Sequence, residues 1–295
     1  MYTTLISADQ LSGLRAAEAP LMIFDCSFDL MNPAAGEQQY RGAHIPGAVY
    51  AHLDTALSDS GVVEADGRQH PRSDAASGGR HPLPSRERFA MWLSGVGFGN
   101  QMQAVVYDRS SGTYGGRLWW MLKWAGHEAV AVLDGGLAAW QAAGGEVTDR
   151  EEPSHFQSNF RLGAPLRRLV VTREVQQRLG DPVQTLVDAR AAPRFRGEVE
   201  PLDPVAGHIP GALNRPAAQN FGADGRFKPP AQLRAEFEAL LAGRAAATVV
   251  HHCGSGVSAL PNLIAMEVAG LGPTSLYAGS WSEWCSDRSR PVEKG

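Results

Sequence analysis

The chain has 295 residues, of which 43% are hydrophobic and 20% are charged, a balance typical of a folded globular protein. Its net charge of −4 lacks the basic surplus that a nucleic-acid-binding protein normally carries. No apolar run approaches the roughly 20 residues of a membrane-spanning helix, and the first residues do not resemble a secretory signal peptide. We therefore expect no nucleic-acid partner and no membrane partner, and the length favours two domains.

The three cysteines, Cys26, Cys253 and Cys285, are too few and too scattered for a disulfide framework. None belongs to the Cys-x-x-Cys pair of a common structural zinc site, so we expect no metal. Free thiols persist in a reducing compartment, and this favours a cytoplasmic protein. We expect Cys26 to lie in the core, because it follows an apolar run, and Cys285 to lie near the surface.

Four short motifs occur in the same order in the two halves of the chain. The sequence His-Ile-Pro-Gly-Ala stands at 44–48 and again at 208–212, an offset of 164 residues. Short apolar runs that end in Asp25 and Asp188 precede the two copies. Two further motif pairs follow at an offset of 144 residues. The order indicates an internal duplication, and the change of offset means that the first half carries about 20 additional residues.

Short apolar strands alternate with helices in both halves. Ser7 with Gln10 predicts a capping box at the start of the first helix. Thr172 begins the equivalent helix of the second half, which we expect to stop at Gly180. The other expected elements are strands at 21–24, 104–106, 186–187 and 248–250 and helices at 117–124 and 233–242. This alternation predicts an α/β fold in which each domain is a mainly parallel sheet with helices on both faces.

Composition predicts where the domains meet. Residues 149–165 are polar and charged, with few aliphatic side chains, and are expected to form a linker. We therefore expect one domain at 1–148 and another at 166–295. The additional residues of the first half fall in an insertion at about 55–84, which is rich in Gly, Ser, Asp, Arg and His. Such a composition predicts a long loop, and long loops in compact domains are often functional.

Cys253 occupies the position that carries most information about chemistry. It follows an apolar strand and opens a segment with two glycines, after which a helix is expected near Ser258. The glycines allow several backbone N–H groups to face inward, and the helix N-terminus adds positive potential. A lone cysteine is more often a buried structural residue, but this strand, loop and helix favour a nucleophilic thiolate.

Two chemistries use such a loop. A cysteine phosphatase has His-Cys, then five residues, then an arginine that clamps the phosphate. His252 and Cys253 fit this opening, but Ala259 stands where the arginine is required. A persulfide needs only backbone N–H groups around its outer sulfur. The segment therefore favours sulfur transfer over phosphate transfer.

With these motifs the sequence resembles the tandem rhodanese-domain sulfurtransferases over nearly its whole length. The segment from Cys253 is similar to the active loop of 3-mercaptopyruvate sulfurtransferases, with Ser258 where these usually have Thr. Thiosulfate sulfurtransferases of this architecture typically have Arg-Lys where this chain has Gly254 and Ser255. The resemblance implies two rhodanese-like domains, the second of them catalytic.

The resemblance further implies an enzyme that moves the sulfur of 3-mercaptopyruvate, through a persulfide on Cys253, to a thiol or cyanide and releases pyruvate. The partners are then a small-molecule sulfur donor and an acceptor such as thioredoxin or a small thiol, and no cofactor is needed. Thiosulfate as the donor, and a non-catalytic sulfur-carrier or regulatory module, are the alternatives that the sequence leaves open.

Several site residues follow from the same resemblance. Arg109 takes the place of the cysteine in the first half, which should be catalytically silent while its insertion supplies groups to the other half's site. Asp54 and His81 match an acidic residue and a histidine of the family, and with Ser255 they would form a proton relay beside the cysteine. Arg190 matches the arginine that binds the donor's carboxylate.

Other residues are expected to assist at the site. One of Arg194 and Arg196 should help Arg190, although both could equally form ion pairs with neighbouring glutamates. His52 and His70 compete with His81 for the relay position. The loop residues expected to contact the substrate are Gly254, Gly256, Val257 and Ser258.

Residues shared by both halves are expected to be structural, because the silent half keeps them too. These residues are His44, His208, Asp25 and Asp188.

Overall fold

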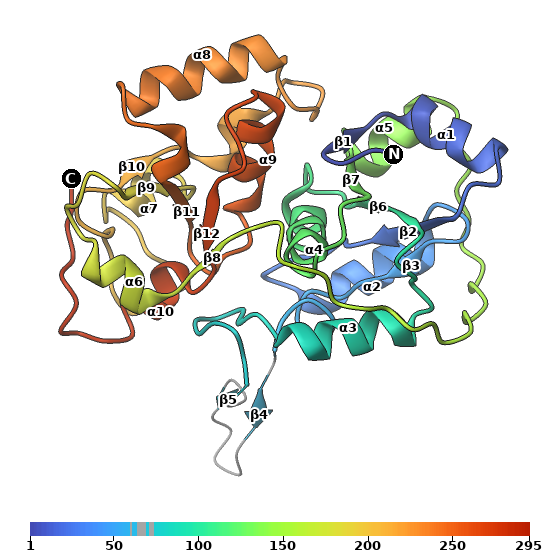
Figure 1. Cartoon of the computed structure of the whole chain (residues 1–295), viewed down its shortest axis with the longest axis horizontal. Helices are drawn as coiled ribbons and strands as arrows, with labels where there is room; N and C mark the ends of the chain where they lie inside the picture. The colour runs from blue at the N-terminus through green and yellow to red at the C-terminus, as the bar shows by residue number, and fades with distance from the viewer. Residues whose placement is uncertain (60, 64–68, 71–73) are drawn as a thin grey trace. The chain divides into compact units, whose positions relative to one another are not determined.

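The computed structural model describes residues 1–59, 61–63, 69–70 and 74–295, and Figure 1 labels its helices and strands. Contacts divide the chain into two compact units. Unit 1 comprises Met1–Ser58, Pro84–Leu166 and Gly222–Phe227, and unit 2 comprises Asp59–Leu83, Arg167–Phe221 and Lys228–Gly295. The insertion of the first half, from Asp59 to Leu83, thus belongs to unit 2.

Unit 1 is built on a parallel sheet of five strands in the order β1-β7-β6-β2-β3. Its strands are β1 (Leu5–Ile6), β2 (Leu21–Asp25), β3 (Val49–Tyr50), β6 (Gln103–Tyr107) and β7 (Val130–Leu133). The central strand β6 and its neighbour β2 are the strands predicted at 104–106 and 21–24, each slightly longer than expected.

The helices of unit 1 are α1 (Ala8–Ala16), α2 (Pro33–Gly42), α3 (Arg86–Gly95), α4 (Thr113–Trp124) and α5 (Gly136–Ala142). The predicted capping box at α1 is confirmed. The Ser7 side chain accepts the N–H of Gln10, and the Gln10 side chain accepts the N–H of Ser7. Helix α4 contains the helix predicted at 117–124.

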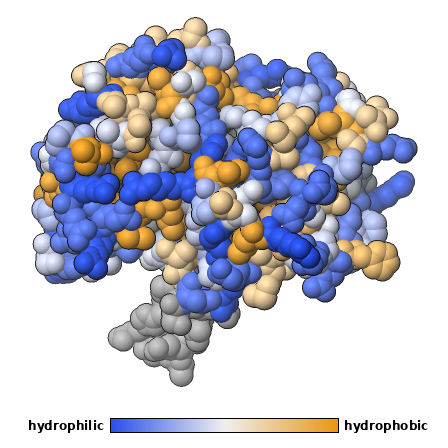
Figure 2. Space-filling model, in the orientation of Figure 1, coloured by the Kyte–Doolittle hydropathy of each residue, from blue (hydrophilic) through white to orange (hydrophobic). Residues whose placement is uncertain are grey.

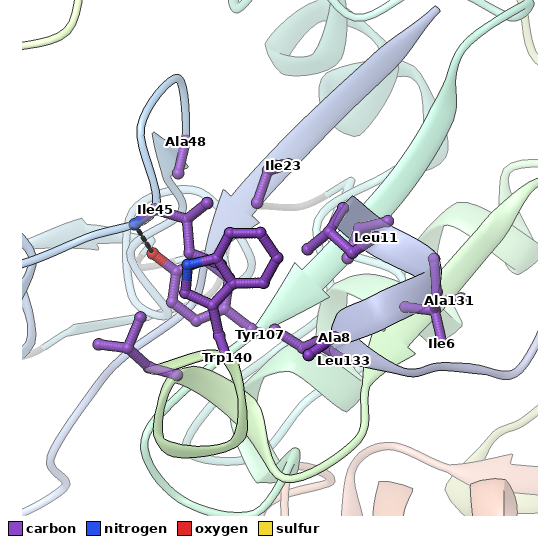
Figure 3. Close-up of a cluster of buried hydrophobic side chains, with 12 residues drawn as sticks. Ile6, Ala8, Leu11, Ile23, Ile45, Ala48, Tyr107, Ala131, Leu133 and Trp140 are labelled. Atoms are coloured by element: carbon purple, nitrogen blue, oxygen red, sulfur yellow. Dashed lines mark hydrogen bonds between the residues drawn. The ribbon is translucent and has the colours of Figure 1, made fainter. Parts of the chain in front are cut away.

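Alternation along β2 gives the sheet of unit 1 two buried faces. Ile23 packs with Leu11 of α1 and Trp140 of α5 in the cluster of Figure 3, where the hydroxyl of Tyr107 also accepts the N–H of Ile45. The next residue, Phe24, points to the opposite face. Its ring centroid lies 5.9 Å from that of Trp92 in α3. Both faces are covered, as expected for a parallel sheet.

Unit 2 repeats this plan, with five parallel strands in the order β10-β9-β11-β12-β8. The strands are β8 (Leu169–Val170), β9 (Thr185–Asp188), β10 (Leu213–Asn214), β11 (Val249–His252) and β12 (Ser275–Tyr277). Strands β9 and β11 take the places of β2 and β6. The internal duplication read from the sequence is therefore a duplication of the whole sheet.

The helices of unit 2 are α6 (Thr172–Gln177), α7 (Ala192–Phe195), α8 (Pro230–Leu241), α9 (Leu260–Val268) and α10 (Ser280–Trp284), with 3-10 turns η1 (Ala217–Asn220) and η2 (Ala246–Thr248). Val175 of α6 and the two tryptophans of α10 pack on one face of the sheet. Helices α8 and α9 contact each other and lie together in Figure 1.

Three local expectations differ from the structure. Helix α6 ends at Gln177, before the expected stop at Gly180. Helix α9 begins at Leu260, two residues after Ser258, with Pro261 in its first turn, where the missing N–H of proline costs nothing. Cys285 was expected near the surface but is buried, because it packs with the tryptophans of α10.

The repeated His-Ile-Pro-Gly turns hold distant chain segments. The N–H of His44 donates to the carbonyl of Thr148, and that of His208 donates to Glu293, both at 2.9 Å. Their rings stack on Tyr40 and Phe195, with centroids 4.1 and 3.8 Å apart. Because the two histidines make equivalent contacts in both units, we assign both a structural role, as expected.

The insertion forms the two-stranded antiparallel pair β4 (Val62–Val63) and β5 (Gln69–His70). Residues 60, 64–68 and 71–73 of the loop predicted at about 55–84 lie outside the described residues. Among the helices of the described part, none is long and apolar enough to cross a membrane. On the face drawn in Figure 2, hydrophilic side chains are interspersed with hydrophobic ones.

Candidate active site around Cys253

Cys253 is the first residue after β11, at the carboxyl end of a central strand. Its N–H donates to the Ser280 hydroxyl at 3.1 Å, and its carbonyl accepts the N–H of Trp281 at 2.9 Å. Both partners belong to the first turn of α10. The cysteine is only 1% exposed. Its backbone is thus held on both sides by the start of one helix.

Ser280 is a site residue that the sequence analysis missed. Its φ of +56° is left-handed, a conformation that costs a non-glycine residue about 1 kcal/mol or more. The equivalent residue of unit 1 is Gly136, with φ +58°. Serine at this position makes two hydrogen bonds that glycine could not make. Its hydroxyl accepts the Cys253 N–H and donates to the Tyr277 carbonyl at 3.0 Å. The repeat offset of 144 residues pairs Ser280 with Gly136, and this pairing was the one sign in the sequence that position 280 has a special backbone conformation.

The loop after Cys253 curls tightly. Gly256 has φ +75°, and a Cβ there would lie 2.3 Å from the carbonyl oxygen of Ala278, so only glycine fits. Within the described part of the chain, four of the loop's N–H groups donate to no other residue; they are those of Gly254, Ser255, Val257 and Ser258. These groups are available to an anion or to a polarised sulfur.

His81 meets this loop directly. Its Nδ1 lies 2.7 Å from the Ser255 hydroxyl, and both side chains are buried. The two residues are 174 positions apart in the sequence. The predicted approach of the insertion to the cysteine loop therefore has a geometric basis within unit 2.

Two glycines before His81 allow the chain to lie against α10. The N–H of Gly78 donates to Glu283 at 3.1 Å, and the N–H of Arg80 donates to the Ser282 hydroxyl at 3.0 Å. Gly79 has φ +85°, and a Cβ on it would stand 2.6 Å from the Gly279 carbonyl oxygen. The position of His81 thus depends on a close backbone contact.

Asp54, the third member of the expected relay, lies in unit 1, whereas His81 and Ser255 lie in unit 2. Its N–H donates to Nδ1 of His52 at 3.1 Å, and burial raises the pKa of its carboxyl group. Its part in the relay stays a prediction. The His52 ring lies edge-on to Phe28. The side chain of His70 lies outside the described residues.

Arg190 lies in a buried cluster at the carboxyl end of β9. Its guanidinium donates to Asp188 at 2.6 Å, to Glu200 at 3.3 Å and to the Gly207 carbonyl at 2.7 Å, and it has no exposed surface. Burial lowers the pKa of Arg190, but Asp188, Glu200 and Cys253 raise it more. The guanidinium therefore stays charged close to the thiol. Its donors are largely used, which leaves little for a substrate.

The two remaining arginines differ. Arg194 donates to Glu200 at 2.6 Å and is 19% exposed. Arg196 pairs with the exposed Glu198, and among the described residues it makes no hydrogen bond or ion pair with the cysteine loop. A Cβ on Gly254 would lie 3.5 Å from Nη1 of Arg194, so the structure brings Arg194, and not Arg196, to the cysteine loop. Arg80 was not predicted, yet it also reaches this cluster through Asp203 at 2.6 Å.

Comparison with known proteins identifies the family. A model of the rhodanese-like domain matches residues 7–143 and 171–287. The chain belongs to the rhodanese family and contains two copies of its domain. The rhodanese fold and the tandem arrangement predicted from the sequence are confirmed. Because the curated relatives are sulfurtransferases, this rhodanese is a sulfur-group transferase.

Individual relatives align with this rhodanese over nearly its whole length. A probable 3-mercaptopyruvate sulfurtransferase of Pseudomonas aeruginosa is 45% identical over 99% of this chain and 98% of its own. A Mycobacterium tuberculosis protein with a provisional thiosulfate sulfurtransferase name is 38% identical over 99% and 97%. The crystal structure of an Escherichia coli 3-mercaptopyruvate sulfurtransferase is 29% identical, covers 95% of this chain and 100% of its own, and superposes with a TM-score of 0.75.

Proposed function

We propose that this rhodanese is a 3-mercaptopyruvate sulfurtransferase and that Cys253 is its nucleophile. The names of the relatives support sulfur transfer from either of two donors. The observation that favours 3-mercaptopyruvate is the 2.7 Å contact between His81 and the Ser255 hydroxyl beside the cysteine loop. A proton source is needed when pyruvate leaves and is not needed when sulfite leaves from thiosulfate.

In the first step the Cys253 thiolate attacks the sulfur of 3-mercaptopyruvate. A sulfur–sulfur bond forms, the carbon–sulfur bond breaks, and its electron pair stays on carbon as the enolate of pyruvate. One proton converts the enolate to pyruvate. Ser255 donates that proton and recovers one from His81, because an imidazole can both give and take a proton. Asp54 is assigned to orienting His81.

The product of this step is a persulfide on Cys253. The N–H groups of Gly254, Ser255, Val257 and Ser258, which have no acceptor among the described residues, are suited to hold its outer sulfur. An acceptor thiolate then attacks the outer sulfur, and the Cys253 thiolate leaves. A small thiol, a dithiol protein such as thioredoxin, or cyanide could serve as the acceptor.

Arg190 is assigned to stabilising the thiolate from below, since its buried ion pairs leave it little capacity for a donor. Residues 166–295 form the catalytic domain, and residues 1–148 form the silent domain whose insertion completes the site. We place the protein in the cytoplasm, because three unpaired cysteines, one of them a nucleophile, require a reducing compartment.

Replacing His81 by Ala tests the choice of donor. We expect kcat with 3-mercaptopyruvate to fall by about 10²–10⁴-fold, the usual contribution of general acid–base catalysis. With thiosulfate, kcat should fall far less. His52→Ala is the control and should leave both values nearly unchanged. Equal losses with the two donors would contradict the relay, and faster turnover of thiosulfate than of 3-mercaptopyruvate by the unmodified enzyme would favour the alternative donor.

A further inference from the structure

Unit 1 has a hollow of about 420 Å³ that no step of the proposed reaction uses. Residues of helix α2, of strand β3 and of the segment 149–152 line it. A second hollow, of about 240 Å³, shares Tyr40, Tyr50 and Glu152 with the first and is otherwise lined largely by apolar residues and backbone. The two hollows are therefore neighbouring parts of one site, whose volume is that of a small-molecule site.

The larger hollow is negatively charged. Its lining contains two arginines and four carboxylates, those of Glu37, Asp149, Glu151 and Glu152. One of the arginines is already paired with Glu37 at 2.7 Å. Burial and the nearby Glu152 raise the pKa of Tyr40 to about 12, so this tyrosine stays neutral and adds no charge. The lining thus favours a cation over an anion.

The hollow also has an excess of hydrogen-bond acceptors. Oε1 of Glu152 accepts the N–H of Gly47 at 2.7 Å and lies 3.3 Å from Nε2 of His44, whereas Oε2 has no hydrogen-bond partner among the described residues. The hydroxyl groups of Tyr40 and Tyr50 donate to backbone carbonyls at 2.7 and 3.0 Å. Their oxygens can then only accept from a ligand. The Glu152 side chain is 21% exposed, so a ligand can reach it.

Unit 2 separates what the fold requires from what the hollow adds. Its equivalent carboxylate, Glu293, accepts the N–H of Gly211 at 2.9 Å, so this contact belongs to the shared fold. The two tyrosines are not shared. Phe195 stands in the place of the first, under the stacked histidine, and Asn214 stands in the place of the second, beside the strand-end aspartate. The tyrosine acceptors of the hollow are therefore particular to unit 1 and are not needed to build the sheet.

We propose that this hollow binds a small organic cation, a primary ammonium group carried on an apolar body. An ammonium group has three N–H donors, which Oε2 of Glu152 and the two tyrosine oxygens accept. The apolar body lies in the smaller hollow, along Val49 and Val96. The site lies wholly in unit 1, apart from the cysteine loop, and does not rest on the proposed function.

The test uses two probes with the same ring system: tryptamine, which carries an ammonium group, and tryptophol, in which a hydroxyl group replaces it. Calorimetry on the full chain should show tryptamine binding at least about 10-fold more tightly. Glu152→Gln keeps an oxygen for Gly47 but removes the charge, and it should weaken tryptamine binding by about 10-fold. Glu293→Gln makes the same change at the equivalent place of unit 2 and should leave binding unchanged.

Equal affinity for tryptamine and tryptophol would overturn the proposal, because the carboxylates would then not recognise the ligand. Equal weakening in Glu152→Gln and Glu293→Gln, or no binding of tryptamine to the unmodified protein, would overturn it as well. Glu151→Gln is a second variant, at an exposed side chain, in case Glu152→Gln disturbs the fold. It should weaken tryptamine binding by about 2–3-fold, and unchanged binding in both Glu151→Gln and Glu152→Gln would contradict the site.

Discussion

The loops that follow β6 and β11 occupy the same place in the two units but treat their backbone N–H groups differently. In unit 1 the Asp108 carboxylate accepts four N–H groups at 2.7–2.9 Å, those of Ser110, Gly112, Tyr114 and Gly115. In unit 2 His252 stands at the equivalent position, and the loop N–H groups named above have no acceptor among the described residues. The fold builds an anion cradle twice, and only unit 1 fills it with its own side chain.

The two units also differ in which arginine binds the buried aspartate at the end of the strand. In unit 1, Arg109 lies where the cysteine lies in unit 2, and its guanidinium donates to Asp25 at 3.0 Å. In unit 2 the equivalent aspartate, Asp188, is bound by Arg190 from the end of its own strand. Each buried aspartate needs a cationic partner. Because Arg190 supplies it in unit 2, the first position of the loop is free for Cys253.

The largest effect is expected when Cys253 of unit 2 is replaced and a cysteine is placed at the equivalent position, 109, of unit 1. Cys253→Ser should lower sulfur transfer by about 10³-fold or more, because no thiolate remains to form a persulfide. Adding Arg109→Cys to that variant should not restore activity, since Asp108 still fills the cradle. Steady-state rates with 3-mercaptopyruvate measure both. Cys285→Ala should keep most activity. Recovery by Arg109→Cys would show that the filled cradle is not what silences unit 1.

The Asp108 carboxylate should be essential for the stability of unit 1. Asp108→Ala leaves four N–H groups without an acceptor, and we expect the free energy of unfolding to fall by about 3–5 kcal/mol. Denaturant unfolding followed by fluorescence measures the change. The exposed Asp149 provides the control, and Asp149→Ala should change stability by about 0.5 kcal/mol or less. A loss of similar size in both variants would be inconsistent with the cradle.

The contact of the insertion with α10 belongs to unit 2 and should be sensitive to one methyl group. Gly79→Ala introduces a Cβ 2.6 Å from the Gly279 carbonyl oxygen at a φ of +85°. The resulting displacement of His81 should lower kcat with 3-mercaptopyruvate by about 10–100-fold. Gly13→Ala, where a Cβ has open space, is the control. Normal turnover by Gly79→Ala would show that the contact does not position His81.

A smaller difference concerns acid stability. Burial, together with the neighbouring His252, lowers the pKa of His251 from 6.5 to about 3, whereas the equivalent residue of unit 1 is Tyr107. Between these two values the unfolded chain binds a proton that the folded chain does not, so stability falls as the pH is lowered. The slope from this residue is at most about 1.4 kcal/mol per pH unit. His251→Leu should flatten the pH dependence of unfolding in this window, and an unchanged slope would contradict the assignment.

Local patterns in the sequence predict much of the fold. The capping box at Ser7 depends on residues three positions apart, and the central strands depend on short apolar runs, so both are visible without tertiary contacts. The repeated motifs extend this to the order of the elements, because a duplicated sequence folds into a duplicated sheet. Cys253 is recognisable for the same reason, since its strand, loop and helix are contiguous.

The parts that sequence analysis missed arise from contacts between distant residues. Asp203 joins Arg80 and Arg194 across the fold, and no local pattern indicates which arginines a buried carboxylate will pair. The sequence analysis expected Arg190 to bind a substrate. It could not foresee the ion pair with Asp188, because that pair depends on the geometry at the end of β9. Ser280 takes a left-handed conformation that its residue type does not suggest. Such features depend on packing as much as on residue type.

The most direct test of the account is to locate the sulfur. The enzyme is mixed with 3-mercaptopyruvate in the absence of an acceptor, digested under non-reducing conditions and analysed by mass spectrometry. The account predicts that the peptide bearing Cys253 gains the mass of one sulfur atom, that the peptides with Cys26 and Cys285 do not, and that an added thiol removes it. Cys253 without the added sulfur after donor turnover, or the same addition on all three cysteines, would contradict the central claim that one open cradle, in unit 2, carries the reaction.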